Sequence, residues 1–289
     1  MPGSGQGVTV SACPRILADY PGDAPRAANC SAPDLPARLK PGSQRLEKSL
    51  RAMVLKSMKP MDLTAELVAL CERHVPEPGP RVDVTYLSDD GYVAVAEDLL
   101  GQNGSGPLWI FAYGSLIWNP GFTWVEHQRG TAHGWHRRFS MKLTRWRGTP
   151  EQPGLMLALE RGGACDGVLF RLPAQKTAAE LARALQRETD GHEDLAYVRW
   201  ITVRAGGERR RALAFWAHPK GFHLPEPPSL DLAAQMLARA CGHMGSGAAY
   251  LFNTVAHLAE HGIYDRNLWQ LQRMVAREIM ATYPASGDD

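Results

Sequence analysis

The sequence predicts an α+β fold in which a small mixed β-sheet or barrel is flanked by helices and followed by C-terminal helices. Three observations support this fold class. An apolar run at residues 108–113 is typical of a buried strand, short β-rich runs separated by turn residues occupy residues 131–217, and apolar residues recur at helical spacing after residue 230. The chain has 289 residues and is 44% hydrophobic, which is enough for a substantial core.

The N-terminal part of the chain is expected to lie outside the main domain. Residues 1–42 are rich in Pro, Gly, Ala and Ser without a period that could bury a face, which predicts a disordered extension. Residues 43–106 predict a helical region and linker. Their first helix, over 43–58, is basic and amphipathic, so it could dock on a surface or partner, or only attach loosely to the domain.

Two further helices are expected before the main domain. Asp62 and Thr64 offer capping side chains for a helix with an apolar stripe, and a short helix is expected around residues 92–100. The residues around this short helix are punctuated by Pro, Gly and Asp, which is typical of a linker.

Residues 108–113 form the strand around which the rest of the chain is organised. They are apolar or aromatic and predict a strand that is buried on both faces, and Gly114 and Ser115 then interrupt it. A glycine at this place lets the backbone turn sharply, so that consecutive amide N–H groups can surround an anionic or carbonyl oxygen. The alternative is an ordinary turn between two core segments.

The runs that follow predict one mixed sheet or barrel. They are rich in strand-forming residues and bounded by turn residues. Their expected bounds are residues 131–139, 154–159, 167–172, 195–203 and 211–217. Gly206 and Gly207 predict a tight hairpin between the last two. The arginines at its tip could contact phosphate, but no aromatic residues are interleaved with them, which favours a solvated turn.

One helix is expected among the strands, at residues 177–189, with Thr177 as its cap. Leu181, Leu185 and Glu188 are spaced i, i+4 and i+7, so the carboxylate of Glu188 falls on the apolar stripe that faces the core. Burying a lone carboxylate is costly and usually raises its pKa, which would make it a stronger general base.

A structural interpretation of Glu188 is also open. Arg187 or another arginine could pair with the carboxylate, or the end of the helix could fray and expose it. Glu180 belongs to the first turn of the same helix, where the helix dipole favours a negative charge.

The C-terminal part of the chain predicts three helices. The first two are expected at residues 230–240 and 248–260; Gly262 ends the second, and Asp265 starts the third. The glycine-rich residues 242–247 do not follow a predicted strand and match neither dinucleotide nor Walker motifs. We therefore expect a tight turn between helices there.

Composition excludes several classes of function. The formal charge of +2, from 32 basic and 30 acidic residues, provides no global field that would recruit nucleic acid or a membrane, so a small-molecule partner is favoured. The five cysteines are scattered without CxxC or zinc-site spacing, which argues against a disulfide scaffold and against a metal site. No apolar stretch of membrane-span length and no secretory signal is seen, and we expect a cytoplasmic protein.

Several motifs follow one another along the chain. They are FAYGSLIWNP at residues 111–120, GWHRRF at 134–139, RGTP at 147–150, GVLFRL at 167–172, the Arg187-Glu188 pair and GIYD at 262–265. In order and spacing, this set resembles the ChaC-like (glutathione-specific) γ-glutamylcyclotransferase family over about residues 63–281. The resemblance implies a small mixed β-barrel flanked by helices and a catalytic domain over residues 107–283.

The resemblance also implies a set of site residues. The loop that binds the γ-glutamyl group would consist of Tyr113, Gly114, Ser115 and Leu116. Glu188 would be the catalytic carboxylate. Arg147 and Tyr250 are pocket residues by motif position, with a surface cation and a core aromatic as the alternatives.

The implied reaction is the cleavage of glutathione to 5-oxoproline and cysteinylglycine. The α-amine of the substrate attacks its own γ-carbonyl, so the nucleophile is intramolecular and no cofactor is required. Glu188 would move the proton, while amides of the loop either offset charge on the tetrahedral oxygen or anchor the substrate carboxylate. Two alternatives are a cyclotransferase for other γ-glutamyl compounds and a non-catalytic γ-glutamyl-binding module.

Overall fold

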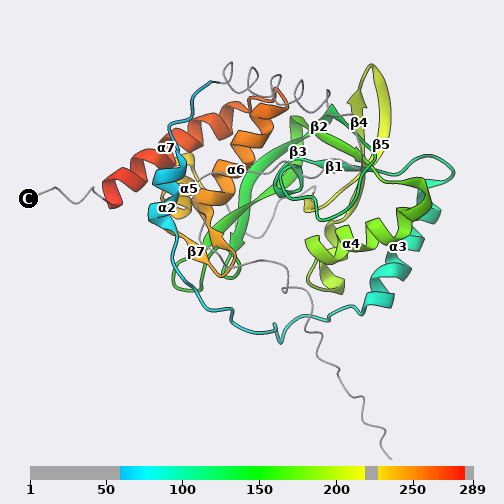
Figure 1. Cartoon of the computed structure of the whole chain (residues 1–289), viewed down its shortest axis with the longest axis horizontal. Coiled ribbons are helices and arrows are strands. Elements are labelled where there is room, and N and C mark those ends of the chain that lie inside the picture. The colour runs from blue at the N-terminus through cyan, green and yellow to red at the C-terminus, as the bar shows by residue number, and fades with distance from the viewer. Residues whose placement is uncertain (1–58, 219–226, 284–289) are drawn as a thin grey trace, which may run out of the picture.

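The computed structural model describes residues 59–218 and 227–283 of the chain. A central group of strands lies between two groups of helices (Figure 1). On one side are α3 (Asp89–Asn103) and α4 (Thr177–Glu188). The other group consists of α2 (Ala65–Cys71), α5 (Leu230–Arg239), α6 (Gly247–Glu260) and α7 (Arg266–Thr282). The extension expected at 1–42 and the helix expected at 43–58 lie outside the described residues.

Five of the described strands close into a barrel. They are β1 (Trp109–Ala112), β2 (Glu126–Leu143), β3 (Gly154–Arg171), β4 (Arg199–Ala205) and β5 (Glu208–Ala214). Their order is β1-β5-β4-β2-β3, and β1 also pairs with β3, which closes the ring. Because β1 is parallel to β5 and antiparallel to β3, the barrel is mixed, as predicted. The short β6 (Ala217–His218) pairs with β3 outside the ring.

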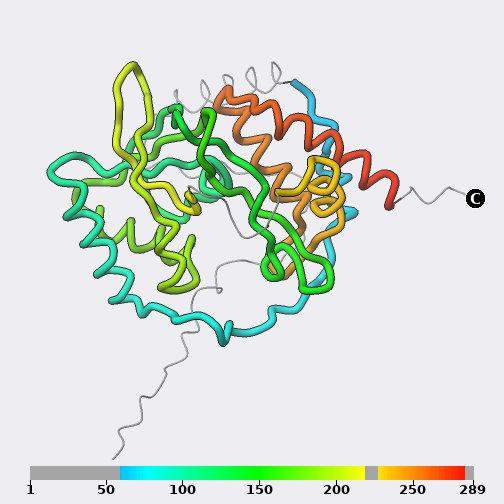
Figure 2. Tube along the Cα trace, turned by 180° about the vertical axis from the view of Figure 1, so that it is seen from behind, coloured from blue at the N-terminus to red at the C-terminus, as the bar shows by residue number. Residues whose placement is uncertain are grey.

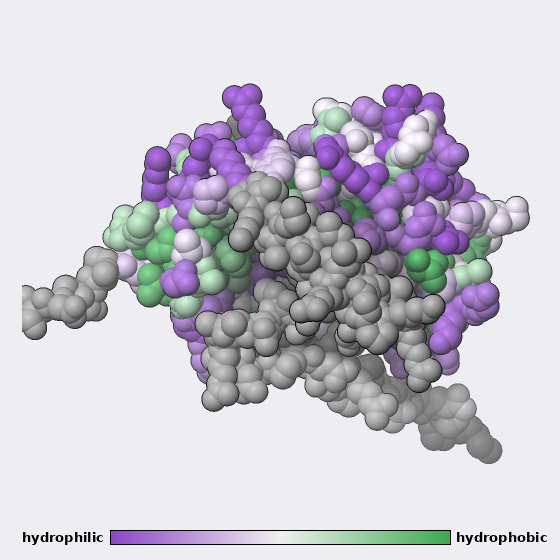
Figure 3. Space-filling view, turned by 45° about the horizontal axis from the view of Figure 1, so that its top comes forward, coloured by the Kyte–Doolittle hydropathy of each residue, from purple (hydrophilic) through white to green (hydrophobic). Residues whose placement is uncertain are grey.

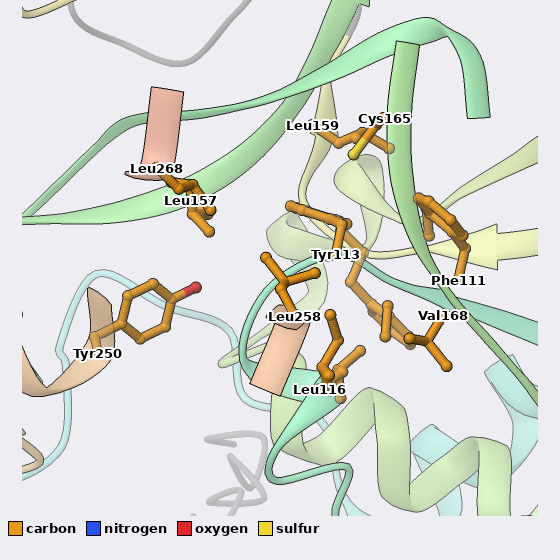
Figure 4. Packing of buried hydrophobic residues seen from close by; sticks show 14 of the residues in the cluster. Phe111, Tyr113, Leu116, Leu157, Leu159, Cys165, Val168, Tyr250, Leu258 and Leu268 are labelled. Atoms are coloured by element: carbon orange, nitrogen blue, oxygen red, sulfur yellow. The ribbon is translucent and has the colours of Figure 1, made fainter. Parts of the chain in front are cut away.

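The strand at the centre of the prediction is confirmed, since every residue of β1 is buried. Two neighbouring strands, β3 on one side and β5 on the other, explain this burial, because β1 has no free edge within the barrel. Figure 4 shows Phe111 of this strand among the packed side chains of the core.

The segments expected as strands at 154–159 and 167–172 lie in strand β3, but the break expected between them was wrong, because β3 is one continuous strand of 18 residues. Residues 161–164 of β3 are exposed and have the sequence Arg-Gly-Gly-Ala, so the hydrophobic pattern is interrupted there. Pairing with β2 holds on both sides of Gly162 and Gly163, with a register shift between His133 and Trp135. Backbone pairing between β2 and β3 therefore keeps β3 continuous, although its hydrophobic pattern is interrupted.

The later strands also differ from their expected bounds. The segment expected to be a strand at 195–203 begins with a 3₁₀ helix, η3 (His192–Tyr197), and β4 starts only at Arg199. The hairpin between β4 and β5 is confirmed: Gly206 and Gly207 have φ angles of +58° and +84°, as a two-residue turn with left-handed central residues requires.

Helix ends follow local capping signals, with one exception. Thr64 caps α2 and Asp265 caps α7 through side-chain oxygens that accept backbone N–H groups, as predicted. Thr177 does not cap α4: its hydroxyl donates to the carbonyl of Pro173, and Lys176 occupies the cap position without a side-chain bond. The 3₁₀ turn just before α4 places Thr177 inside the first helical turn.

Two other expectations need correction. The helix expected at about 92–100 is longer, because α3 begins at Asp89 with Ser88 as its cap. The turn expected at 242–247 contains a small hairpin of β7 (Cys241–Gly242) and β8 (Gly245–Ser246). This hairpin connects α5 to α6.

The segment between α2 and α3 runs along one edge of the molecule, as seen from behind in Figure 2. It joins the two helix groups across the barrel end. Hydrophilic residues prevail on the described surface drawn in Figure 3, with smaller hydrophobic areas between them. Among the described helices, none combines the length and the apolar character that crossing a membrane would demand.

Candidate active site

The loop after β1 is fixed tightly against its surroundings. Gly114 is followed by a single 3₁₀ turn, η1 (Ser115–Ile117). A Cβ atom added to Gly114 would lie 3.0 Å from the hydroxyl oxygen of Tyr250. Glycine therefore allows the loop backbone and the Tyr250 side chain to approach each other closely, which a larger residue would prevent.

The side chain of Tyr113 faces the core and not the loop interior. Its hydroxyl donates to the carbonyl of Phe215 over 2.9 Å, and its burial raises the pKa of Tyr113 well above the ordinary value. The carbonyl of Tyr113 accepts from the Nη1 atom of Arg137 over 2.6 Å. Leu116 is only 5% exposed and lies in the same cluster (Figure 4). What the loop can offer a ligand is therefore mainly the backbone around Gly114 and the side chain of Ser115.

Tyr250 approaches this loop from α6. Its ring has edge contacts with Trp118 at 6.2 Å and Phe139 at 5.9 Å between centroids. Figure 4 shows its hydroxyl directed toward the segment that carries Tyr113 and Leu116. Burial raises the pKa of Tyr250, so the side chain is a neutral hydrogen-bond donor at neutral pH.

Arg147 lies beside Tyr250. The centre of its guanidinium group is 5.4 Å from the centroid of the Tyr250 ring and 5.9 Å from that of Trp118. Its Nη1 atom donates to the carbonyl of Ser246 over 3.2 Å. The positive charge of Arg147 opposes the rise in the pKa of Tyr250. Arg147 thus lies against the Tyr250 and Trp118 rings, and Tyr250 is a buried aromatic.

Glu188 is the last residue of α4. Leu181 and Leu185 on the same stripe are fully buried, and the Glu188 side chain is 9% exposed, as the helical spacing predicted. The Oε1 atom of Glu188 accepts a hydrogen bond from Nη1 of Arg187, which is the pairing that the structural interpretation foresaw. The carboxylate is therefore both largely buried and paired with a cation.

Arg187 connects Glu188 to the other site residues. A Cβ atom added to Gly121 would lie 2.5 Å from Cδ of Arg187, so the aliphatic part of this arginine packs on the loop after η1. Gly121 has a φ of +71°, a conformation that favours glycine. Arg187 also opposes the rise in the pKa of Tyr250, which places its charge near that ring.

The structure thus gathers the predicted residues at one end of the barrel. The loop at Gly114 and Ser115, Arg147 and Tyr250 are in direct contact or close range, and Glu188 joins them through Arg187. Sequence reasoning did not assign Arg187 or Trp118 to the site. Both lie within matched motifs, which was the available signal. Only the fold shows that Trp118 contacts Tyr250 and that Arg187 packs on Gly121.

The described residues give less support to metal-dependent catalysis or to a cysteine nucleophile. Within residues 59–218 and 227–283, no group of three or more His, Cys, Asp or Glu side chains is arranged to hold a metal ion. Cys71, Cys165 and Cys241 are free and buried. Burial raises the pKa of Cys71 to about 12 and that of Cys165 to about 11, so neither thiol is poised as a thiolate nucleophile.

Comparison with solved structures identifies the fold. The fold is similar to that of the crystal structure of a γ-glutamyl cyclotransferase specific to glutathione from yeast, with a TM-score of 0.53 and 20% sequence identity. The match covers 60% of this chain and 97% of the yeast chain. The closed mixed barrel with its surrounding helices is thus a γ-glutamylcyclotransferase fold.

Sequence comparisons identify the family. The family model described as ChaC-like protein matches residues 108–278. The chain is 35% identical over 192 residues to the glutathione-specific γ-glutamylcyclotransferase of Escherichia coli, covering 66% of this chain and 82% of that protein. It is 30% identical to γ-glutamylcyclotransferase 2-3 of Arabidopsis thaliana, covering 60% and 90% respectively. The chain belongs to the ChaC-like protein family.

Proposed function

We propose that this chain is a γ-glutamylcyclotransferase that cleaves glutathione to 5-oxoproline and cysteinylglycine. The observation that carries the proposal is a carboxylate, Glu188, that is 9% exposed and adjoins a glycine-containing loop through Arg187, in a member of the ChaC-like family. The names of the E. coli and human relatives, both glutathione-specific γ-glutamylcyclotransferases, support glutathione as the substrate.

The charges at the site suit this substrate. Arg147 and Arg187 both lie near the Tyr250 ring, and glutathione carries two carboxylates. Guanidinium groups bind carboxylates well, because their planar donors match the two oxygens. The backbone at Gly114 and Ser115 lies against the Tyr250 hydroxyl, so the loop and Tyr250 present polar groups at one place. The substrate would thus be held folded, with its amine close to its own γ-carbonyl.

The reaction forms one C–N bond and breaks another. The α-amine attacks the γ-carbonyl carbon and closes a five-membered ring, and the bond from that carbon to the cysteinyl nitrogen then breaks. The amine must first lose a proton. With ordinary pKa values of about 7.7–8.0 for the ammonium and about 4.3 for a glutamate, this transfer costs about 5 kcal/mol.

Glu188 serves in both proton transfers of the proposed mechanism. The substrate ammonium can replace Arg187 as the charge partner of the carboxylate when the substrate enters the site. After accepting this proton, the carboxyl group delivers it to the departing cysteinyl nitrogen; the regenerated carboxylate then takes the second proton, which the ring nitrogen loses, and passes it to the freed amine. The neutral Tyr250 hydroxyl, directed at the loop, can donate to the tetrahedral oxygen together with a loop amide.

The proposal is tested by incubating the purified chain with glutathione and measuring 5-oxoproline and cysteinylglycine. We expect both products in equal amounts, and the same rate in EDTA, because the proposed chemistry uses no metal. Loss of activity in EDTA that zinc or manganese restores would contradict the cofactor-free mechanism.

The same assay separates the alternative functions. Release of 5-oxoproline from γ-glutamyl-alanine but not from glutathione would indicate a cyclotransferase for other γ-glutamyl compounds. Tight binding of glutathione without turnover would indicate a binding module.

We also propose a cytoplasmic location, which the free state of the described cysteines supports, and cell fractionation would test it.

A further inference from the structure

The end of helix α2 contacts the candidate site through a single carboxylate. Glu72 follows the last residue of α2 and lies outside the segment that the family model matches. Its Oε1 atom accepts two hydrogen bonds from Ser246, one from the backbone nitrogen over 3.1 Å and one from the hydroxyl oxygen over 2.6 Å. Glu72 and Ser246 are 174 positions apart in the sequence, so this contact is purely tertiary.

Ser246 occupies a position that links three parts of the site. It is the cap residue of α6, and its hydroxyl oxygen accepts from the backbone nitrogen of Ala249 over 3.0 Å. That first turn leads directly to Tyr250. The carbonyl of Ser246 accepts from Nη1 of Arg147 over 3.2 Å. A shift of Ser246 would therefore move both the start of α6 and the partner of Arg147.

The residue before Ser246 shows how closely the three groups approach. Gly245 has a φ of +93°. A Cβ atom added to it would lie 3.3 Å from Nη1 of Arg147 and 3.5 Å from Oε2 of Glu72. The carboxylate and the guanidinium therefore flank the same short stretch of backbone.

Helix α2 gives Glu72 a fixed base. Leu63, just before the helix, is fully buried, and its backbone nitrogen donates to Oε1 of Gln272 in α7 over 2.8 Å. At the other end, the Cys71 thiol donates to the carbonyl of Ala238 over 3.1 Å. Because both ends are anchored in the C-terminal helices, the carboxylate of Glu72 is held at a defined place.

We propose that Glu72 is a positioning residue, which holds Ser246 and through it sets Arg147 and Tyr250 in the arrangement that binds the substrate. This inference rests on the function proposed above. It also extends the functional part of the chain beyond residues 108–278, which the family model matches, because Glu72 lies at the end of α2.

The kinetic test compares Glu72→Ala, Glu72→Gln and a control on the same helix. Glu72→Ala removes both acceptor bonds, and we expect KM for glutathione to rise by about 5- to 20-fold with a smaller change in kcat. Glu72→Gln keeps an acceptor oxygen and should recover most of that loss. Glu66→Ala changes an exposed carboxylate of α2 and should leave both parameters unchanged.

A second measurement does not depend on turnover. Hydrogen exchange of the Ser246 amide should be faster in Glu72→Ala than in the unchanged chain, and unaffected in Glu66→Ala. If the unchanged chain does not cleave glutathione, the proposed function fails while this measurement still tests the contact. Unchanged KM or unchanged exchange at Ser246 in Glu72→Ala would overturn the inference. If Glu72→Ala does not fold, exchange of the Ser246 amide is measured in Glu72→Gln, whose neutral oxygen is a weaker acceptor than the carboxylate, and exchange as slow as in the unchanged chain would then overturn the inference.

Discussion

The two ends of helix α4 each carry a largely buried carboxylate, and the two are held differently. Glu180 lies in the first turn and is 3% exposed. Its Oε2 atom accepts from the backbone nitrogen of Thr123 over 2.8 Å, and the positive end of the helix dipole favours its charge. Glu188 lies at the opposite end, where the dipole disfavours an anion, and its recorded partner is the side chain of Arg187.

This difference shows that burial alone does not identify a catalytic carboxylate. A carboxylate bound by a fixed backbone amide has a permanent role in the fold, because leaving that amide unpaired is costly. A carboxylate paired with a long side chain can exchange that partner for a substrate ammonium. We therefore propose a structural role for Glu180 and proton transfer for Glu188, and the predictions below test this difference.

The largest effect is expected for Glu188→Gln. This change keeps the shape of the side chain and removes the base, so kcat for glutathione should fall by about 10²- to 10⁴-fold while the fold survives. Turnover is measured by 5-oxoproline release, and circular dichroism confirms folding. Near-normal turnover would show that the carboxylate was wrongly assigned.

The matched change at the other end of α4 is Glu180→Ala. It leaves the amide of Thr123 without its partner, so the free energy of unfolding should fall by about 1–3 kcal/mol. The kcat of the folded protein should stay within about threefold of the unchanged chain. Denaturant unfolding and turnover are measured on the same preparation. A loss of kcat as large as that of Glu188→Gln would remove the distinction between the two ends.

A smaller effect is expected for Ser115→Ala. The substrate supplies the attacking amine, and no nucleophile motif surrounds Ser115, so this change should lower kcat/KM by less than about tenfold through the loop. Mass spectrometry after rapid quenching should find no covalent intermediate. A glutamyl adduct on Ser115 would overturn the mechanism and give the loop, not α4, the central chemical role.

The smallest effect is expected from removing residues 1–58. A chain that begins at Lys59 keeps α2, Glu72 and both ends of α4, so its kcat and KM should match those of the full chain. Turnover and circular dichroism are measured side by side. A shortened chain that folds but no longer cleaves glutathione would place control of the site in the N-terminal region.

The sequence by itself determined features that depend on neighbouring residues. The buried strand β1, the apolar stripe of α4 that ends at Glu188, the glycine hairpin and the caps at Thr64 and Asp265 were all predicted. Each follows from local periodicity or from a side chain that bonds a nearby amide. The motifs also indicated the family, which the comparisons confirmed.

Only the tertiary structure decided which of these residues meet. The continuity of β3 depends on pairing with β2 on both sides of an exposed, glycine-containing stretch. The inward direction of Tyr113, which leaves the loop backbone for the ligand, depends on a carbonyl 102 positions away. The contact of Glu72 with Ser246 depends on packing between the N-terminal and C-terminal helices. These pairings arise when the barrel closes and the helices dock on it, and local sequence carries no record of partners brought together in that way.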